Sequence, residues 1–200
     1  MLNSHYAEEI EKILPRVMAH IPSACRLVGA EFLPPKKNGE RLHPAVLTLD
    51  ELIVRFGPRK RNGKRVVFTN GCFDLLHPGH IHILEQARQQ GDALVVGLNS
   101  DESIRGLKGT GRPVIRAEER AEILASLECV DAVVIFEEAT PQRVIAALLP
   151  DILVKGGDWP ADQIVGREEV EAAGGEVVRV EVVPGYSTSE ILKRITKGGG

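Results

Sequence analysis

The chain has 200 residues, of which 43% are hydrophobic and 26% charged, and a net charge of −3. This composition suits an ordinary globular domain with an appendage. No apolar run approaches the roughly 20 residues that cross a bilayer, and the N-terminus lacks a signal-peptide pattern, so we expect a cytoplasmic protein without a membrane partner. The widely spaced Cys25, Cys72 and Cys129 argue against a disulfide framework and favour reduced, mostly buried thiols.

The first 65 residues precede the regular part of the chain. Residues 1–45 are predicted to form a helical appendage, because apolar side chains recur at helical spacing over residues 6–21; Pro15 should kink or divide that helix. Residues 46–65 are predicted to be a short helix, within residues 47–56, and a basic lead-in, GPRKRNGKR. A nucleic-acid contact is one interpretation of this basic segment. A solvated linker is favoured, because no aromatic residues interleave with the cations.

From residue 66 onward, short β-branched runs alternate with helical stretches. The predicted strands are Val66–Thr69, Ala93–Leu98, Ala132–Phe136, Ile152–Lys155 and Glu176–Val183. The predicted helices are Gly79–Gln90, Ala117–Leu127, Pro141–Leu149, Arg167–Ala173 and Ser187–Thr196. This alternation predicts an α/β fold for residues 66–200, a Rossmann-like doubly wound parallel sheet with helices on both faces. The last strand alternates with charges and is expected at an edge. Ligands should bind beyond the C-terminal ends of the strands, where the strand order reverses.

The stretch NGCFDLLHPGH, residues 70–80, leaves the first predicted strand. Gly71 permits a tight turn, and Pro78 suits the first turn of the next helix. His77 and His80 would then share one face at the helix N-terminus, where free N–H groups and the helix dipole already favour an anion. Two imidazoles in this place favour phosphate chemistry, such as phosphoryl or nucleotidyl transfer. The alternatives are a zinc pair, for which no third ligand stands nearby, and a capped helix with incidental histidines. His82 is interpreted as a surface or packing residue.

The motif GCFDLLHPGH matches the G-x-F-D…H-x-G-H signature, so the chain resembles the nucleotidyltransferase superfamily of cytidylyltransferases and adenylyltransferases. Four further stretches, residues 99–114, 119–131, 136–159 and 174–195, resemble the adenylyltransferase domain of the bacterial heptose enzymes. The resemblance covers roughly residues 46–196. It implies the HxGH nucleotidyltransferase fold and a reaction that converts D-glycero-β-D-manno-heptose 1-phosphate and ATP to ADP-heptose and pyrophosphate.

The resemblance also assigns residues to the nucleotide. It implies that Cys72 and Phe73 offer their backbone to the phosphates, and that His77 and His80 contact the phosphates and act as catalytic residues. The other nucleotide-binding residues that it implies are Arg120, Lys155, Asp158, Ser187 and Thr188. Some of these residues have a simpler alternative: Arg120 could be a surface residue, and Ser187 or Thr188 could only begin a helix. Trp159, beside Asp158, could stack on a ring or could only pack.

The second reactant is assigned in the same way. The resemblance implies that Lys108, in the glycine-rich stretch RGLKGTGRP, is catalytic and binds the substrate phosphate. It assigns Asp74, Asp101 and Arg112 to the substrate as well. A solvated loop side chain remains the alternative for Lys108 and Arg112. Asp101 could only cap the next turn, and Asp74 is better suited to orienting its own turn than to acting as a general base, because a sugar phosphate is already anionic.

The expected enzyme is therefore a sugar-1-phosphate adenylyltransferase that works by direct in-line attack. We expect Mg²⁺ to arrive on the triphosphate, because the sequence shows no dedicated carboxylate cage or other metal ligands. The expected partners are ATP, a sugar 1-phosphate and a separate upstream sugar kinase, because residues 1–45 are too short for a kinase; a homodimer is an open expectation and nucleic acid is disfavoured. Two alternatives stay open: a glycerol-3-phosphate-type cytidylyltransferase and a nucleotide-binding regulatory protein without turnover.

Overall fold

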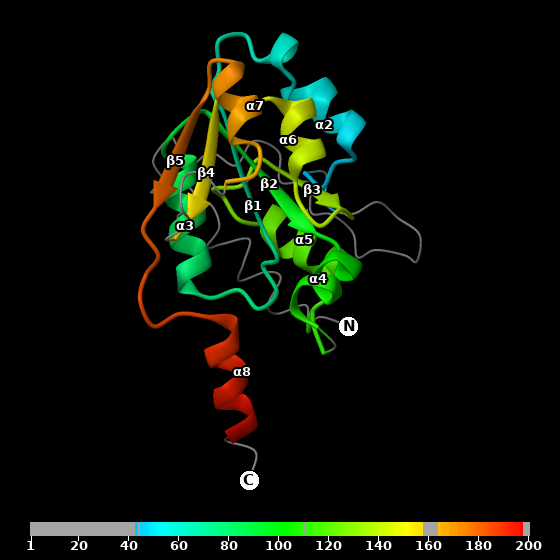
Figure 1. Ribbon diagram of the computed structural model, residues 1–200, viewed down its shortest axis with the longest axis vertical. Helices are drawn as coiled ribbons and strands as arrows, with labels where there is room; N and C mark the ends of the chain where they lie inside the picture. The colour runs from blue at the N-terminus through cyan, green and yellow to red at the C-terminus, as the bar shows by residue number, and fades with distance from the viewer. Residues whose placement is uncertain (1–42, 44, 110, 158–163, 198–200) are drawn as a thin grey trace, which may run out of the picture. The chain divides into compact units, whose positions relative to one another are not determined.

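The structure, a computed structural model, describes residues 43, 45–109, 111–157 and 164–197 (Figure 1). The chain divides into two units, Met1–Glu40 and Arg41–Gly200, and every described residue belongs to the second unit. The predicted appendage over residues 1–45 lies almost entirely outside the described residues and stays a prediction. No helix in the described ranges combines the length and the apolar character that crossing a bilayer requires.

Five parallel strands form one sheet in the order β3-β2-β1-β4-β5. The strands are β1 (Val66–Gly71), β2 (Ala93–Asn99), β3 (Ala132–Phe136), β4 (Ile152–Gly156) and β5 (Glu176–Val180). Every residue of β2 is buried, as expected for an apolar strand covered on both faces. Strand β5 lies at the edge and exposes Glu176 and Arg179, as its alternating charges predicted.

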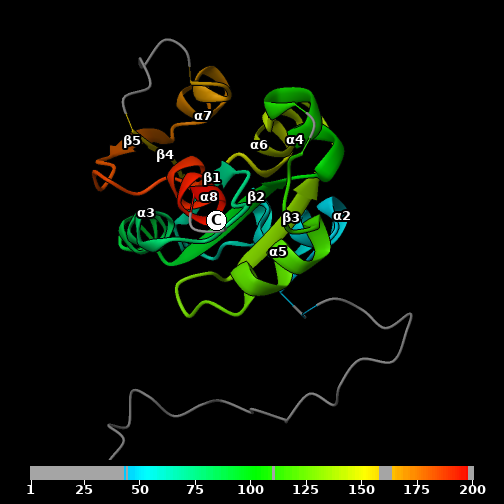
Figure 2. The same ribbon diagram turned by 90° about the horizontal axis from the view of Figure 1, so that it is seen from below.

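Helices cover both faces of the sheet (Figure 2). On one face, α3 (Pro78–Arg88) and α5 (Ala117–Ala125) contribute Leu84, Ala87, Ala121 and Leu124 to the core. On the other face, α2 (Leu49–Phe56), α6 (Gln142–Leu148) and α7 (Arg167–Ala172) contribute Leu52, Ile145, Leu148 and Val170. The predicted doubly wound α/β fold is therefore confirmed, since each face of the sheet has its own buried apolar layer.

Helix α4 (Asp101–Lys108) is an element that the sequence analysis missed, having taken Lys108 as part of a glycine-rich loop. Ser100 caps this helix by accepting a hydrogen bond from the Ser103 N–H, and Asp101 and Glu102 lie in its first turn. The loop begins only at Gly109, whose φ of 83° belongs to the left-handed region. Helix α8 (Thr188–Lys197) closes the described chain close to its predicted position.

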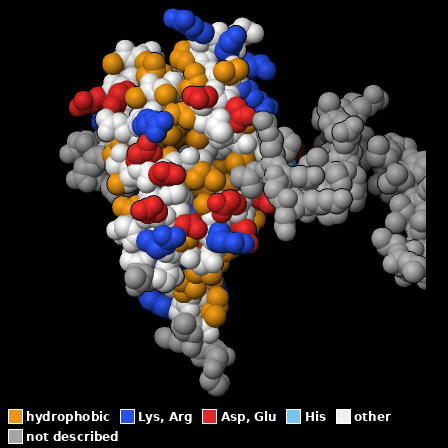
Figure 3. Space-filling model, turned by 90° about the vertical axis from the view of Figure 1, so that its right-hand side faces the viewer, with side chains coloured by type: hydrophobic (Ala, Val, Ile, Leu, Met, Phe, Trp, Pro, Cys, Tyr) orange, Lys and Arg blue, Asp and Glu red, His pale blue; other side chains and the backbone are white. Residues whose placement is uncertain are grey.

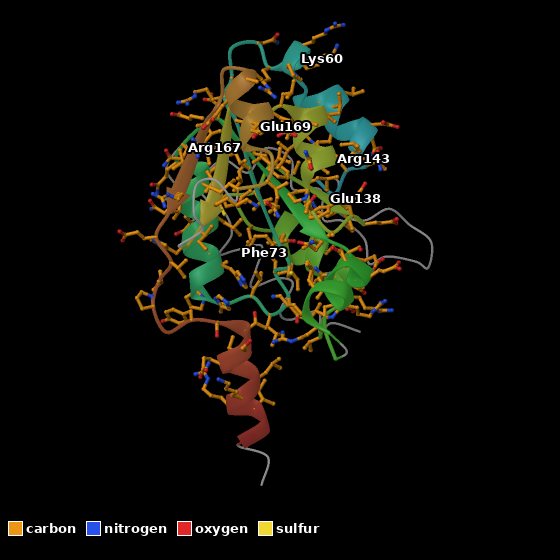
Figure 4. The ribbon with its side chains drawn as sticks, in the orientation of Figure 1. Lys60, Phe73, Glu138, Arg143, Arg167 and Glu169 are labelled. Atoms are coloured by element: carbon orange, nitrogen blue, oxygen red, sulfur yellow. The ribbon has the colours of Figure 1, made fainter. Side chains whose placement is uncertain are left out.

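The basic segment 57–65 lies at the amino ends of the strands. It contains the 3-10 helix η2 (Pro58–Lys60), and Lys and Arg side chains gather over it (Figure 3). Arg61 contradicts the prediction of a solvated linker, because its side chain is only 9% exposed and pairs with Asp151 at 2.9 Å. Its guanidinium also donates to the Leu148 and Leu149 carbonyls at the end of α6. Lys60 of this segment and Phe73 lie at opposite ends of the sheet (Figure 4).

Candidate active site

The order of the strands places a switch point between β1 and β4. The chain runs outward from β1 through β2 to β3 and then returns to β4 on the other side of β1. In doubly wound sheets, ligands bind outside the carboxyl ends of the strands at such a point. The histidine-bearing turn leaves the carboxyl end of β1, so the fold places this motif where a ligand is expected.

His77 and His80 lie together at the start of α3. His77 is the N-cap, and its Nδ1 accepts a hydrogen bond from the His80 backbone N–H at 3.3 Å. Pro78 occupies the first helical position, where no N–H is needed. The two imidazole rings stack with centroids 3.7 Å apart and planes 16° from parallel. Because Nδ1 of a neutral His77 is an acceptor, its proton sits on Nε2, which is left to donate to a ligand oxygen.

The environment of His80 favours its neutral form. Burial lowers its pKa to about 4, and the positive charges of His77 and Lys108 act in the same direction. Burial also lowers the pKa of His77. Nδ1 of His80 is buried and has no hydrogen-bond partner among the described residues. A bound phosphate would reverse this balance, because an anion close to an imidazole favours the protonated form.

We therefore expect His80 to titrate with a midpoint of about 4 in the free protein. The titration is measured by NMR of the histidine ring protons, and the His80 signals are assigned by their absence in His80→Ala. Adding pyrophosphate should raise that midpoint. As the pH falls from the ordinary value of 6.5 toward about 4, the unfolded chain binds this proton before the folded protein does, so folding stability falls through that window. A midpoint close to 6.5 in the free protein would contradict the burial of this ring.

The backbone before the histidines has an uncommon conformation. Phe73 has a φ of 42°, a left-handed value that non-glycine residues rarely adopt, and its ring lies 5.2 Å from the ring of His80. Such strain persists where the surrounding structure fixes it, often at a binding site. The N–H groups of Phe73 and Asp74 have no hydrogen-bond partner among the described residues, so the turn presents free donors next to two imidazoles.

Asp74 holds this turn against the loop that follows α4. Its buried carboxylate accepts hydrogen bonds from Arg112 at 2.7 Å and from the N–H groups of Val114 and Ile115 at 2.8 and 3.1 Å. Burial would raise the pKa of Asp74, but these hydrogen bonds outweigh it and hold the pKa below its ordinary value. These contacts fit the prediction that Asp74 orients the turn. They give no support to substrate-binding roles for Asp74 and Arg112, which stay predictions.

Arg120 was predicted to reach the phosphates or to lie on the surface. The structure contradicts the surface position, and the contacts of Arg120 give no support to the phosphate role, which stays a prediction. Its side chain is fully buried. The guanidinium donates to the carbonyls of Ile115 at 2.8 Å, Cys72 at 2.6 Å and Asn99 at 2.9 Å, and it pairs with Asp101 at 2.6 Å. Arg120 thus links α5 to the exit of β1, the end of β2 and the start of α4. These buried contacts fix the segments that carry the site.

Lys108 and Asp101 lie at the two ends of α4. Lys108 is the last residue of the helix and is exposed, and its charge acts on His80. Its predicted role as the lysine that binds the substrate phosphate stays a prediction. Asp101 begins the helix but pairs with Arg120, so its predicted contact with the sugar stays a prediction without support from its contacts.

Lys155 brings a second cation to the switch point. It lies near the end of β4, and its Nζ contacts Oδ1 of Asn70 in β1. Burial lowers the pKa of Lys155 to about 8. The sequence analysis did not identify Asn70, because an asparagine at a strand end is also an ordinary turn residue. The adjacent Gly156 packs against α3: a Cβ there would lie 2.6 Å from Cδ1 of Ile83.

The start of α8 meets the start of α3. Ser187 caps α8 by accepting a hydrogen bond from the Glu190 N–H at 3.1 Å, and Thr188 Oγ1 donates to the Leu75 carbonyl at 3.5 Å. The ring of Tyr186 lies 6.4 Å from the ring of His77. Two helix N-termini therefore converge beside the imidazoles, and their dipoles favour an anion between them.

Asp158 and Trp159 lie outside the described residues, so their assignment stays a prediction. Within the described ranges, no group of three or more His, Cys, Asp or Glu side chains is placed to hold a metal ion, and Asp74 and Asp101 each face an arginine. The delivery of Mg²⁺ on the nucleotide stays a prediction.

Comparisons with known proteins agree with this geometry. A family model described as cytidylyltransferase-like matches residues 68–194. Two curated relatives are both named bifunctional protein HldE. The one from Pelobacter propionicus is 58% identical over 146 residues, 73% of this chain and 30% of the relative. The one from Geobacter sulfurreducens is 56% identical over 155 residues, 78% of this chain and 32% of the relative. The chain thus spans about a third of the length of the curated relatives that it matches.

A solved structure with lower sequence identity shares this fold. The lipopolysaccharide core biosynthesis protein from Thermoplasma volcanium superposes with a TM-score of 0.51 and is 28% identical, covering 60% of this chain and 98% of that one.

Proposed function

Because the chain belongs to the cytidylyltransferase-like family, we propose that it transfers an adenylyl group from ATP to D-glycero-β-D-manno-heptose 1-phosphate. The products would be ADP-heptose and pyrophosphate. The identity of 52–58% to bifunctional HldE proteins over about three quarters of the chain carries this proposal. The stacked histidines between two helix N-termini support it, since they suit a reaction that builds negative charge on phosphate oxygens.

The proposed reaction needs no covalent enzyme intermediate. A phosphate oxygen of the sugar 1-phosphate attacks the α-phosphorus of ATP, a new P–O bond forms, and the bond to the β-phosphate oxygen breaks to release pyrophosphate. His77 and His80 would donate hydrogen bonds to the phosphate oxygens as charge shifts toward the leaving group. Lys108 would hold a phosphate above them, and the free N–H groups of the β1 exit would fix the triphosphate. Mg²⁺ would enter on the triphosphate and neutralise part of its charge.

The bifunctional relatives are about three times as long as the region that matches this chain. We propose that a separate sugar kinase supplies the phosphorylated sugar to this chain. We propose a cytoplasmic location as well, because the proposed reactants are a nucleotide and a sugar phosphate. A homodimer remains a proposal to be tested by light scattering.

The test is pyrophosphate release from the purified protein with Mg²⁺. ATP and CTP are each combined with β-heptose 1-phosphate and with glycerol 3-phosphate. We expect release only from ATP with the heptose. Release from CTP with glycerol 3-phosphate would instead identify a cytidylyltransferase. If no mixture released pyrophosphate but calorimetry showed nucleotide binding, the protein would be a binding protein without turnover.

A further inference from the structure

Asn70 and Lys155 lie side by side on neighbouring strands. The pairing of β1 with β4 matches Val67 with Ile152 and Phe68 with Leu153, so two residues further along the same register brings Asn70 opposite Lys155. Their side chains meet through Lys155 Nζ and Asn70 Oδ1. The contact bridges the two strands on either side of the switch point, at their carboxyl ends.

This pair lies on the opposite side of the sheet from the histidines. Side chains alternate along a strand, so Asn70 shares its face with Phe68, and Lys155 shares its face with Leu153. Phe68 and Leu153 belong to the core layer beneath α6 and α7. Helix α3, which carries His80, packs on the other layer through Leu84 and Ala87. The exit of β1 therefore has the two imidazoles on one side of the sheet and the cation Lys155 on the other.

The charge of Lys155 has no described counter-charge. No carboxylate of the described residues pairs with it, Asn70 is neutral, and Arg179, its register partner on β5, is an exposed cation. Burial is the one cause that shifts the pKa of Lys155, so no described charged group offsets the loss of water. A partly buried cation without a partner costs folding free energy, and it is retained most readily where a ligand supplies the opposite charge.

We infer that Asn70 and Lys155 form a second phosphate-binding subsite, which holds an anion on the side of β1 that faces away from the histidines. This inference rests on the proposed function, in which two phosphorylated reactants must lie next to each other. Lys155 keeps two N–H donors after its contact with Asn70, and Asn70 keeps the two donors of its amide. These four N–H donors are available to phosphate oxygens, and the Asn70 oxygen is already engaged by Lys155. The phosphate belongs either to the nucleotide or to the sugar phosphate.

The experiment measures binding of each reactant alone, without turnover, by calorimetry on the full chain. The probes are ATP, β-heptose 1-phosphate and inorganic pyrophosphate. Lys155→Met should weaken the binding of one reactant by about tenfold or more, because a charge-assisted contact is lost. The affected reactant identifies the source of the phosphate. Lys64→Met is the matched control, since Lys64 is an exposed lysine at the other end of the sheet.

Two further measurements distinguish a ligand-binding role of Lys155 from a structural one. Without ligand, Lys155→Met should melt at the same temperature as the wild type or higher, because the substitution removes a cation that has no described counter-charge. At a pH slightly above 8, wild-type binding should take up protons, measured in two buffers of different ionisation enthalpy, and Lys155→Met should not. A lower melting temperature with unchanged binding of every probe would overturn the inference. Loss of pyrophosphate or reactant binding would uphold it even if adenylyl transfer were not observed.

Discussion

Replacing His77 or His80 with alanine is expected to lower kcat by roughly 10²–10³-fold, because each imidazole would stabilise charge that develops in the transition state. The basis is their shared place at the N-terminus of α3, where the rings stack 3.7 Å apart. Under the proposed function the two stacked rings would act on the same phosphate group, so the double variant should lose less than the product of the two single losses. The measurement is pyrophosphate release at saturating ATP and sugar phosphate.

His82→Ala is the control for this pair. His82 lies in the same helix but two positions beyond His80, and we expect this variant to keep kcat close to the wild-type value. Circular dichroism spectra of all variants would show that the helix still forms. Wild-type turnover in both His77→Ala and His80→Ala would show that neither histidine takes part in the reaction. His77 would then serve only as the N-cap of α3.

Arg120→Met is expected to destabilise the folded protein by about 3–5 kcal/mol, the cost of breaking a buried charged pair. The substitution leaves the carbonyls of Cys72, Asn99 and Ile115 without their donor and leaves Asp101 without its partner. Arg120→Lys should recover only part of this loss, because one ammonium group cannot reach partners that a planar guanidinium spans. Urea unfolding, followed by circular dichroism, gives the free energies.

Arg116→Met provides the comparison for Arg120. Arg116 stands at the start of the same helix, but its side chain is 77% exposed and its pair with Glu119 is 3.5 Å long. We expect its replacement to change the free energy of unfolding by less than about 0.5 kcal/mol. Equal losses in the two variants would mean that burial of Arg120 contributes little to stability.

The sequence predicted those parts of the fold that depend on local pattern. The five strands were predicted because β-branched runs such as Ala93–Leu98 are apolar on both faces. His77 was placed at a helix entrance because Pro78 follows it. Helix α4 was missed because Gly106 and Gly109 suggested a loop, although Ser100 followed by Asp101 and Glu102 is a start signal that could have revealed it.

The roles of the buried arginines depend on contacts between distant parts of the chain. Arg61 binds carbonyls 87 and 88 residues away, and Arg120 binds the Cys72 carbonyl 48 residues away. A charged residue in a basic segment or on a helix carries no local sign of such partners. The same holds for the pairing of Asp74 with Arg112, whose partners stand 38 residues apart in the sequence.

The hydrogen bond from Thr188 to Leu75 joins residues 113 positions apart. Everything needed for the five-stranded sheet and its two apolar layers precedes residue 181. We therefore expect that the sheet can form during synthesis before the α8 side of the candidate site has been translated. A chain cut between β5 and α8 is expected to keep the sheet and the histidines but to lose the second helix dipole. Under the proposed function, competence for the reaction would then be acquired last, as a step separable from folding.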